Sequence, residues 1–156
     1  MNTLFVYCSD DEVISCLCNE SAVKLNETKA LSLNRENSLS PFKKHFGVNR
    51  IRRYTYKGDY GINLDEYDKL IIACDEYMGE IPPEISAFIS KADLRYKNID
   101  CIVFGGGRGV KKAEDALKVR VSLSGGTVRN CISISPREIK REEEDVFFSV
   151  RHRLAV

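Results

Sequence analysis

Short apolar segments alternate along this chain with segments in which apolar residues recur at helical spacing. The apolar segments are nearly continuous, which is typical of strands that are buried on both faces of a parallel sheet. They are Thr3–Cys8, Ala30–Leu33, Lys69–Cys74, Asp100–Phe104 and Thr127–Ser135. Because predicted strands alternate with predicted helices, the pattern indicates an α/β fold with a parallel sheet.

The helical patterns lie between these strands and after the last one. They cover Asp10–Leu25, Glu84–Lys91, Val110–Leu123 and Arg137–Leu154. Pro82 and Pro83 fix φ and tolerate the missing N–H groups where the second helix begins. Gly125 and Gly126 are a typical helix stop.

The stretch between the second and third predicted strands has a less regular pattern. Arg35–Arg53 is polar with a few apolar positions, and it predicts a short helix or an ordered excursion. Arg50–Thr55 has the composition of an extended segment, and Lys57–Asn63 contains the residues of a turn.

Composition is that of an ordinary globular protein. The chain has 156 residues, of which 43% are hydrophobic and 30% charged, so we expect one domain spanning residues 1–156. A formal net charge of +1 gives no signal for nucleic-acid binding. No apolar stretch is long enough to span a membrane, and the N-terminus lacks the basic segment of a signal peptide. We therefore expect a cytoplasmic protein.

The cysteines predict little chemistry. The chain has six, at positions 8, 16, 18, 74, 101 and 131, and none forms a CxxC pair. Most lie in or beside apolar segments, where cysteine behaves as a small hydrophobic residue. We interpret them as reduced thiols and expect no disulfide framework.

One segment carries a resemblance to a known family. The stretch from Glu66 to Gly107, EYDKLIIACDEYMGEIPPEISAFISKADLRYKNIDCIVFGGG, resembles the second half of the flavodoxin-like family. The resemblance covers the order of elements over about residues 1–135, and it is specific in its motifs only over Tyr67–Gly107. It implies a three-layer α/β/α sandwich with a five-stranded parallel sheet of order 2-1-3-4-5. It also implies FMN as cofactor, bound in a crevice between the first and third strands.

The resemblance also implies a set of residues for the cofactor. Tyr77 occupies the position of the aromatic residue that stacks on the flavin ring, and Gly79 allows the backbone to approach closely. The backbone of the third-strand loop and of the fourth-strand loop would contact the ring edges; these residues are Asp75, Glu76, Tyr77, Met78, Gly79, Gly105, Gly106 and Gly107. The glycine run has a second interpretation, as a tight turn into the next helix. The implied activity is electron transfer, with a redox protein as partner, or flavin-dependent reduction.

The loop after the first strand departs from the family pattern. In flavodoxins, hydroxyl side chains and backbone N–H groups of this loop surround the FMN phosphate. Here the loop contains Ser9 followed by Asp10, Asp11 and Glu12, with no glycine or threonine. Ser9 remains the one hydroxyl candidate, but the Ser9-x-x-Glu12 spacing predicts a capping box. Three carboxylates would also repel a phosphate. We therefore predict that any flavin is bound weakly, and we keep a second hypothesis, that of a cofactor-less interaction or regulatory module.

Two rival sites are built from the same loops. Asp10, Asp11 and Asp75 resemble the acidic Mg²⁺ pocket of receiver domains, although no lysine precedes Pro136. Cys8 and Cys74 end neighbouring predicted strands, and they form either a redox or soft-metal pair or, as we prefer, buried structural thiols. We assign the two histidines, His45 and His152, to the solvated surface, and we predict no metal ligand and no catalytic residue.

Overall fold

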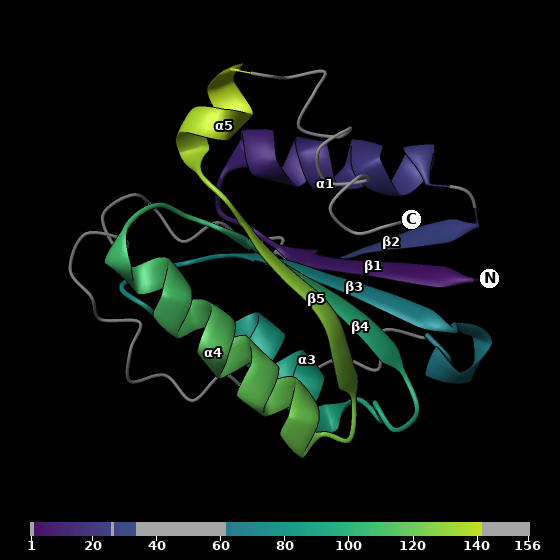
Figure 1. Ribbon diagram of the computed structural model, residues 1–156. Helices are drawn as coiled ribbons and strands as arrows, with labels where there is room; N and C mark the ends of the chain where they lie inside the picture. The colour runs from purple at the N-terminus through teal and green to yellow at the C-terminus, as the bar shows by residue number, and fades with distance from the viewer. Residues whose placement is uncertain (1, 26, 34–61, 142–156) are drawn as a thin grey trace.

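A five-stranded parallel sheet forms the centre of the protein, with the strand order β2-β1-β3-β4-β5 (Figure 1). The computed structural model describes residues 2–25, 27–33 and 62–141. The strands are β1 (Thr3–Cys8), β2 (Thr28–Ser32), β3 (Lys69–Asp75), β4 (Asn98–Phe104) and β5 (Thr127–Ile134). The predicted strand order is confirmed, and every observed strand end lies within two residues of the predicted one.

Helices cover both faces of the sheet (Figure 1). One face carries α1 (Glu12–Lys24) and α5 (Pro136–Arg141), and the other carries α3 (Pro83–Lys91) and α4 (Arg108–Leu123). A short 3₁₀ helix, η2 (Leu64–Glu66), leads into β3. The predicted helix starting at Arg137 is observed only as far as Arg141, where the described residues end.

The core lies on both sides of the sheet because successive side chains of a strand point to opposite faces. In β1, Leu4 and Val6 pack with the residues under α3 and α4, whereas Phe5 and Tyr7 pack with those under α1. The interior residues of β3 and β4 alternate in the same way, and β1 is buried at every position. Burial on both faces explains why these strands read as continuous apolar runs.

Some sequence predictions lie outside the described residues. These are the excursion at Arg35–Arg53, the extended segment at Arg50–Thr55, most of the turn at Lys57–Asn63, both histidines and the rest of the last helix. None of the helices in the described part of the chain is long and apolar enough to cross a membrane.

One charged group is completely buried in the sheet. Asp100 of β4 is 0% exposed, and its Oδ2 lies 2.6 Å from Nζ of Lys69 in β3. Its Oδ1 accepts a hydrogen bond of 2.8 Å from Nδ2 of Asn130 in β5. Because Asp100 alternates with Cys101, it points to the same face as Ile102 and thus toward α1. This polar group therefore joins three adjacent strands from inside the apolar layer.

We predict that Asp100→Asn destabilises the protein by about 3 kcal/mol, because it leaves the Lys69 ammonium in a largely buried position without its counter-charge. Chemical denaturation of the purified variant measures the loss. The double variant Lys69→Met/Asp100→Leu removes both charges and should recover most of it. A single-variant loss below about 1 kcal/mol, the range of exposed ion pairs, would contradict the prediction.

Candidate functional site

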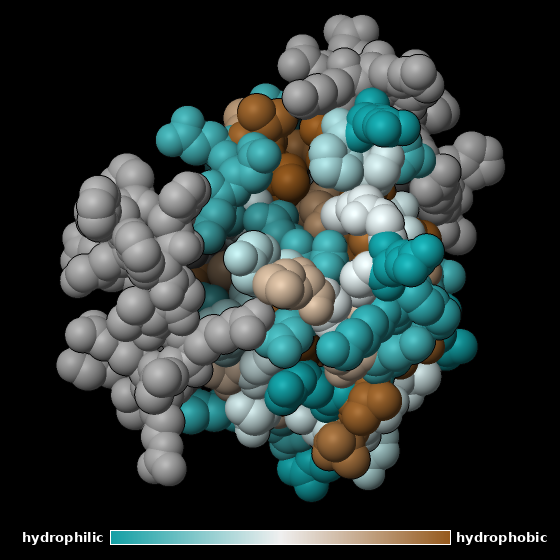
Figure 2. All heavy atoms as spheres, turned by 90° about the vertical axis from the view of Figure 1, so that its left-hand side faces the viewer, coloured by the Kyte–Doolittle hydropathy of each residue, from teal (hydrophilic) through white to brown (hydrophobic). Residues whose placement is uncertain are grey.

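The order of the strands changes direction between β1 and β3. After β1 the chain continues to β2 on one side of the sheet, and after β3 it continues to β4 on the other side. The two strands are neighbours, and Cys8 at the end of β1 pairs with Cys74 near the end of β3. The helix that follows β1 lies on one face and the helix that follows β3 lies on the other (Figure 1). In open α/β sheets, ligands bind at this kind of switch point, outside the carboxyl ends of the strands. Figure 2 looks onto this end of the molecule, which is mainly hydrophilic with scattered apolar atoms.

The loop between β1 and α1 is closed by its own side chains. The N-cap of α1 is Asp11, whose Oδ1 accepts hydrogen bonds from the amides of Val13 (2.8 Å) and Ile14 (3.4 Å). The predicted capping box of Ser9 and Glu12 is therefore wrong. The ionised Asp11 side chain stands directly before the helix and is the stronger acceptor for its first N–H groups.

Ser9 contributes to a link between the two strands instead of capping the helix. Its hydroxyl donates a hydrogen bond of 2.6 Å to Oδ2 of Asp75, and it accepts one of 3.0 Å from the amide of Asp11. The amide of Asp10 also donates to Oδ2 of Asp75, over 3.1 Å. The sequence could not indicate this link, because Ser9 and Asp75 are 66 residues apart.

Asp75 is a half-buried carboxylate, and in the described part of the chain only one of its two oxygens accepts hydrogen bonds. Its Oδ1 is buried and has no hydrogen-bond partner among the described residues. Burial raises the pKa of Asp75 above its ordinary value of 3.8, the hydrogen bonds from Ser9 and Asp10 lower it, and the charges of Asp11 and Asp10 raise it again. The result is a raised pKa, so the folded protein binds a proton at Asp75 more tightly than the unfolded chain does.

This raised pKa predicts a pH dependence of stability. The ionised carboxylate of Asp75 lowers the stability of the folded state. This penalty is complete above the folded pKa of Asp75, and it decreases as the pH falls toward 3.8. Lowering the pH from 7 toward 3.8 should therefore stabilise the wild type relative to Asp75→Asn, which cannot take up the proton. Denaturation of both proteins across this range measures the difference. Parallel curves would mean that the pKa of Asp75 is not raised.

The loop between β3 and α3 presents an aromatic side chain on a tight turn. Tyr77 and Glu80 exchange two backbone hydrogen bonds of 3.1 and 3.0 Å, with Met78 and Gly79 at the tip. Met78 has φ of 53° and Gly79 has φ of 82°. A positive φ is unusual for a residue as bulky as methionine, and strain of this kind is concentrated at functional sites. The side chains of Tyr77 and Met78 are 70% and 68% exposed.

Glu76 holds this turn against the start of α4. Its amide donates to the carbonyl of Phe104 (2.8 Å), and its Oε1 accepts from the amide of Gly79 (2.6 Å). The approach is so close that a Cβ at Gly109 would overlap Oε1 of Glu76. Glu76 is therefore a structural residue in this loop, and the amides of Glu76, Tyr77 and Gly79 are already engaged.

We predict that Gly109→Ala destabilises the protein by roughly 1–2 kcal/mol, since the new methyl group must displace the Glu76 side chain from Gly79. Helix propensity alone predicts the opposite sign, a gain of up to about 1 kcal/mol. The free energy of unfolding therefore separates the two effects, and a gain would contradict the tight contact.

The glycine loop after β4 is a turn into the next helix, which is the second interpretation given by the sequence. It turns directly into α4, with Gly107 as the N-cap at φ of 96° and without a side-chain cap. The amide of Gly105 donates to the carbonyl of Ile134. Gly105–Gly107 also line a hollow of about 360 Å³, together with the start of α4, the end of β5 and Glu138. This hollow lies on the β5 side of the glycine loop, whereas the Tyr77 turn contacts its other side through Glu76.

The rival sites receive no support from the geometry. Within the described ranges, no group of three or more His, Cys, Asp or Glu side chains is placed to hold a metal ion. Asp11 and Asp75, which the receiver hypothesis assigns to Mg²⁺, accept the internal hydrogen bonds described above. Cys8 and Cys74 are neighbours in register, and both are buried. Burial raises the pKa of the Cys74 thiol, as expected of an unreactive structural cysteine.

Comparison with solved structures assigns the fold. A protein from Bacteroides eggerthii, provisionally assigned as a flavoprotein, matches with a TM-score of 0.70 and 15% identity, covering 99% of this chain and 98% of the other. General stress protein 14 from Treponema denticola, solved in complex with FMN, matches with a TM-score of 0.65 and 14% identity, covering 99% and 97%. A flavodoxin from the domain Archaea matches with a TM-score of 0.56 and 16% identity, covering 97% and 100%. No protein-family model and no curated protein sequence matches the chain. The chain has the flavodoxin-like fold.

Proposed function

We propose that this protein binds a flavin ring beside Tyr77 and acts in electron transfer or in flavin-dependent reduction. The observation that carries the proposal is the position of Tyr77, which is 70% exposed on a turn held rigidly at the switch point of a flavodoxin-like sheet. A large exposed aromatic side chain on an ordered turn offers a flat surface for a planar ligand. The fold adds support, since general stress protein 14 and other solved structures with this fold contain FMN.

The two halves of FMN fit the described residues unequally. The Tyr77 turn offers an aromatic surface to an isoalloxazine ring, and the adjacent glycine loop offers open backbone at Gly107, where no atom of the described residues lies within 4 Å of the Cβ position. The β1–α1 loop does not fit the phosphate, because its N–H groups are bound to side-chain oxygens of Ser9, Asp11 and Asp75. When a flavin is bound, the redox chemistry belongs to the flavin itself. The protein would contribute stacking by Tyr77 and exclusion of water from the ring face.

A second candidate is an interaction or regulatory module that uses the same scaffold without a cofactor. The closed β1–α1 loop favours it, because a loop that satisfies its own donors needs no ligand to be stable. The two candidates differ in one measurement, which is whether the purified protein binds flavin at all.

We expect Tyr77→Ala to weaken flavin binding several-fold with little loss of stability, because an aromatic stack contributes about 0.5–1.5 kcal/mol beyond area burial. Quenching of flavin fluorescence on titration with the protein measures the affinity. Tyr77→Phe retains the ring and should bind as the wild type does.

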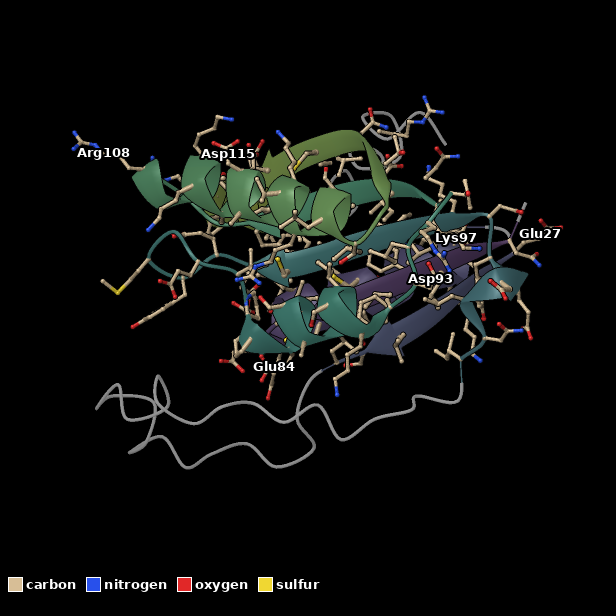
Figure 3. The ribbon with its side chains drawn as sticks, turned by 90° about the horizontal axis from the view of Figure 1, so that it is seen from below. Glu27, Glu84, Asp93, Lys97, Arg108 and Asp115 are labelled. Atoms are coloured by element: carbon tan, nitrogen blue, oxygen red, sulfur yellow. The ribbon has the colours of Figure 1, made fainter. Side chains whose placement is uncertain are left out.

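Tyr96 provides a matched control. It is 96% exposed and lies between α3 and β4, at the opposite end of the sheet, next to Asp93 and Lys97, which Figure 3 labels. Tyr96→Ala should leave flavin binding unchanged. Equal affinities of wild type and Tyr77→Ala would remove Tyr77 from the site, and no binding by the wild type would favour the cofactor-less module.

A further inference from the structure

We propose that the carboxylate of Asp75 occupies the anion-binding position of the β1–α1 loop, so that the crevice selects a phosphate-free flavin over FMN. The inference rests on the proposed flavin binding and specifies its ligand class. It follows from the hydrogen bonds that engage four amides and the Ser9 hydroxyl around the start of α1, together with the charge and the surroundings of Asp75.

Four amides and one hydroxyl that this loop could offer to an anion are already used. The N-terminus of a helix binds anions because its first N–H groups lack partners within the helix. Here Val13 and Ile14 donate to Oδ1 of Asp11, and Asp11 itself donates to the Ser9 hydroxyl. Asp10 and the Ser9 hydroxyl donate to one oxygen, Oδ2 of Asp75.

The two donors on Oδ2 of Asp75 are of the kind that hold a phosphate oxygen. A hydroxyl at 2.6 Å and a backbone amide at 3.1 Å converge on this single anionic oxygen. Asp75 can reach them because β3 runs beside β1 and ends next to the loop. The protein's own carboxylate thus takes the place of a bound anion at the start of α1.

The negative charges around the β1–α1 loop also disfavour a phosphate. A phosphate near this loop would meet Asp75, the capping Asp11 and the first-turn Glu12. The formal net charge of the chain, only +1, supplies no general compensation. At a few ångströms, each of these carboxylates repels a phosphate more strongly than a neutral ribityl chain, which carries no charge.

The remaining oxygen of Asp75 adds to this repulsion. Oδ1 is buried and lacks a donor among the described residues, which is unfavourable for a carboxylate. A phosphate at this position would place a second negative charge beside a carboxylate that its surroundings already stabilise poorly. A ribityl chain brings no charge, so the environment of Asp75 disfavours a phosphate more than an alcohol.

Calorimetric titration of the 156-residue chain with riboflavin and with FMN tests the proposal. We expect the wild type to bind riboflavin at least as tightly as FMN. Asp75→Asn keeps the side-chain shape and removes the charge, so it should raise the FMN affinity about tenfold relative to riboflavin. Asp75 is a sharper target than Asp11, whose replacement would also remove the cap of α1.

Asp93→Asn is the matched control. It removes the same charge from an exposed position at the far end of the molecule from Arg108 and the start of α4 (Figure 3). It should leave the ratio of the two affinities unchanged. Tenfold tighter binding of FMN than of riboflavin by the wild type would overturn the proposal, and so would an unchanged ratio in Asp75→Asn.

A titration with inorganic phosphate separates this inference from the proposed function. The amide signal of Asp10 is followed by NMR in the wild type and in Asp75→Asn. We expect millimolar phosphate to leave it unmoved in the wild type and to shift it in Asp75→Asn. If phosphate shifts the signal only in Asp75→Asn and neither protein binds a flavin, the inference stands and only the proposed function is contradicted. A phosphate-induced shift in the wild type, or none in Asp75→Asn, would overturn the inference.

Discussion

The pairing of β1 with β3 is the constraint on which the rest of the structure depends. Both strands are buried on both faces, so each can be stable only between other strands and beneath helices on both sides. Their register sets Cys8 beside Cys74, and one residue further along it sets the β1–α1 loop beside Asp75. A contact across 66 residues of sequence thereby decides the chemistry of the loop. The same register places the Tyr77 turn at the end where ligands of such sheets bind.

The sequence predicted the elements well because their signals are local. Apolar runs such as Lys69–Cys74, the Pro82-Pro83 helix start and the glycines after β4 each act over a few residues, and the observed elements match them closely. Tyr77, which the family resemblance places at the stacking position, has the exposed side chain that such a role requires. The contacts of Ser9 were predicted wrongly, because a serine followed three residues later by glutamate looks like a capping box whatever lies opposite. Glu76 was expected to present its backbone to a ligand, but its contacts with Gly79 and Phe104 depend on how two loops meet in space.

The carboxyl ends of β1 and β3 combine two regions of different chemical character. Around the Tyr77 turn, exposed aromatic and thioether groups stand on a backbone held by Glu76, and the positive φ of Met78 shows that the tip tolerates strain. Around Asp75, polar groups satisfy one another and leave one buried oxygen without a donor. In the proposed function, recognition of a ring and exclusion of an anion are thus separate properties, carried by different loops. One can be altered without the other, which is how a single scaffold supports different ligands.

The buried Asp100 has a consequence for the outermost strand. Among the described strands, β5 pairs only with β4, and an edge strand with one neighbour can slide along it or recruit another chain. An irregularity opposite Ile99 and Asp100 brings Asn130, not Arg129, into line with Asp100. Sliding by one residue would turn Asn130 to the other face and deprive a fully buried carboxylate of its amide donor. The contact between Asp100 and Asn130 therefore favours the correct alignment of the edge strand, because a misaligned β5 would leave Oδ1 of the buried Asp100 without a hydrogen-bond donor.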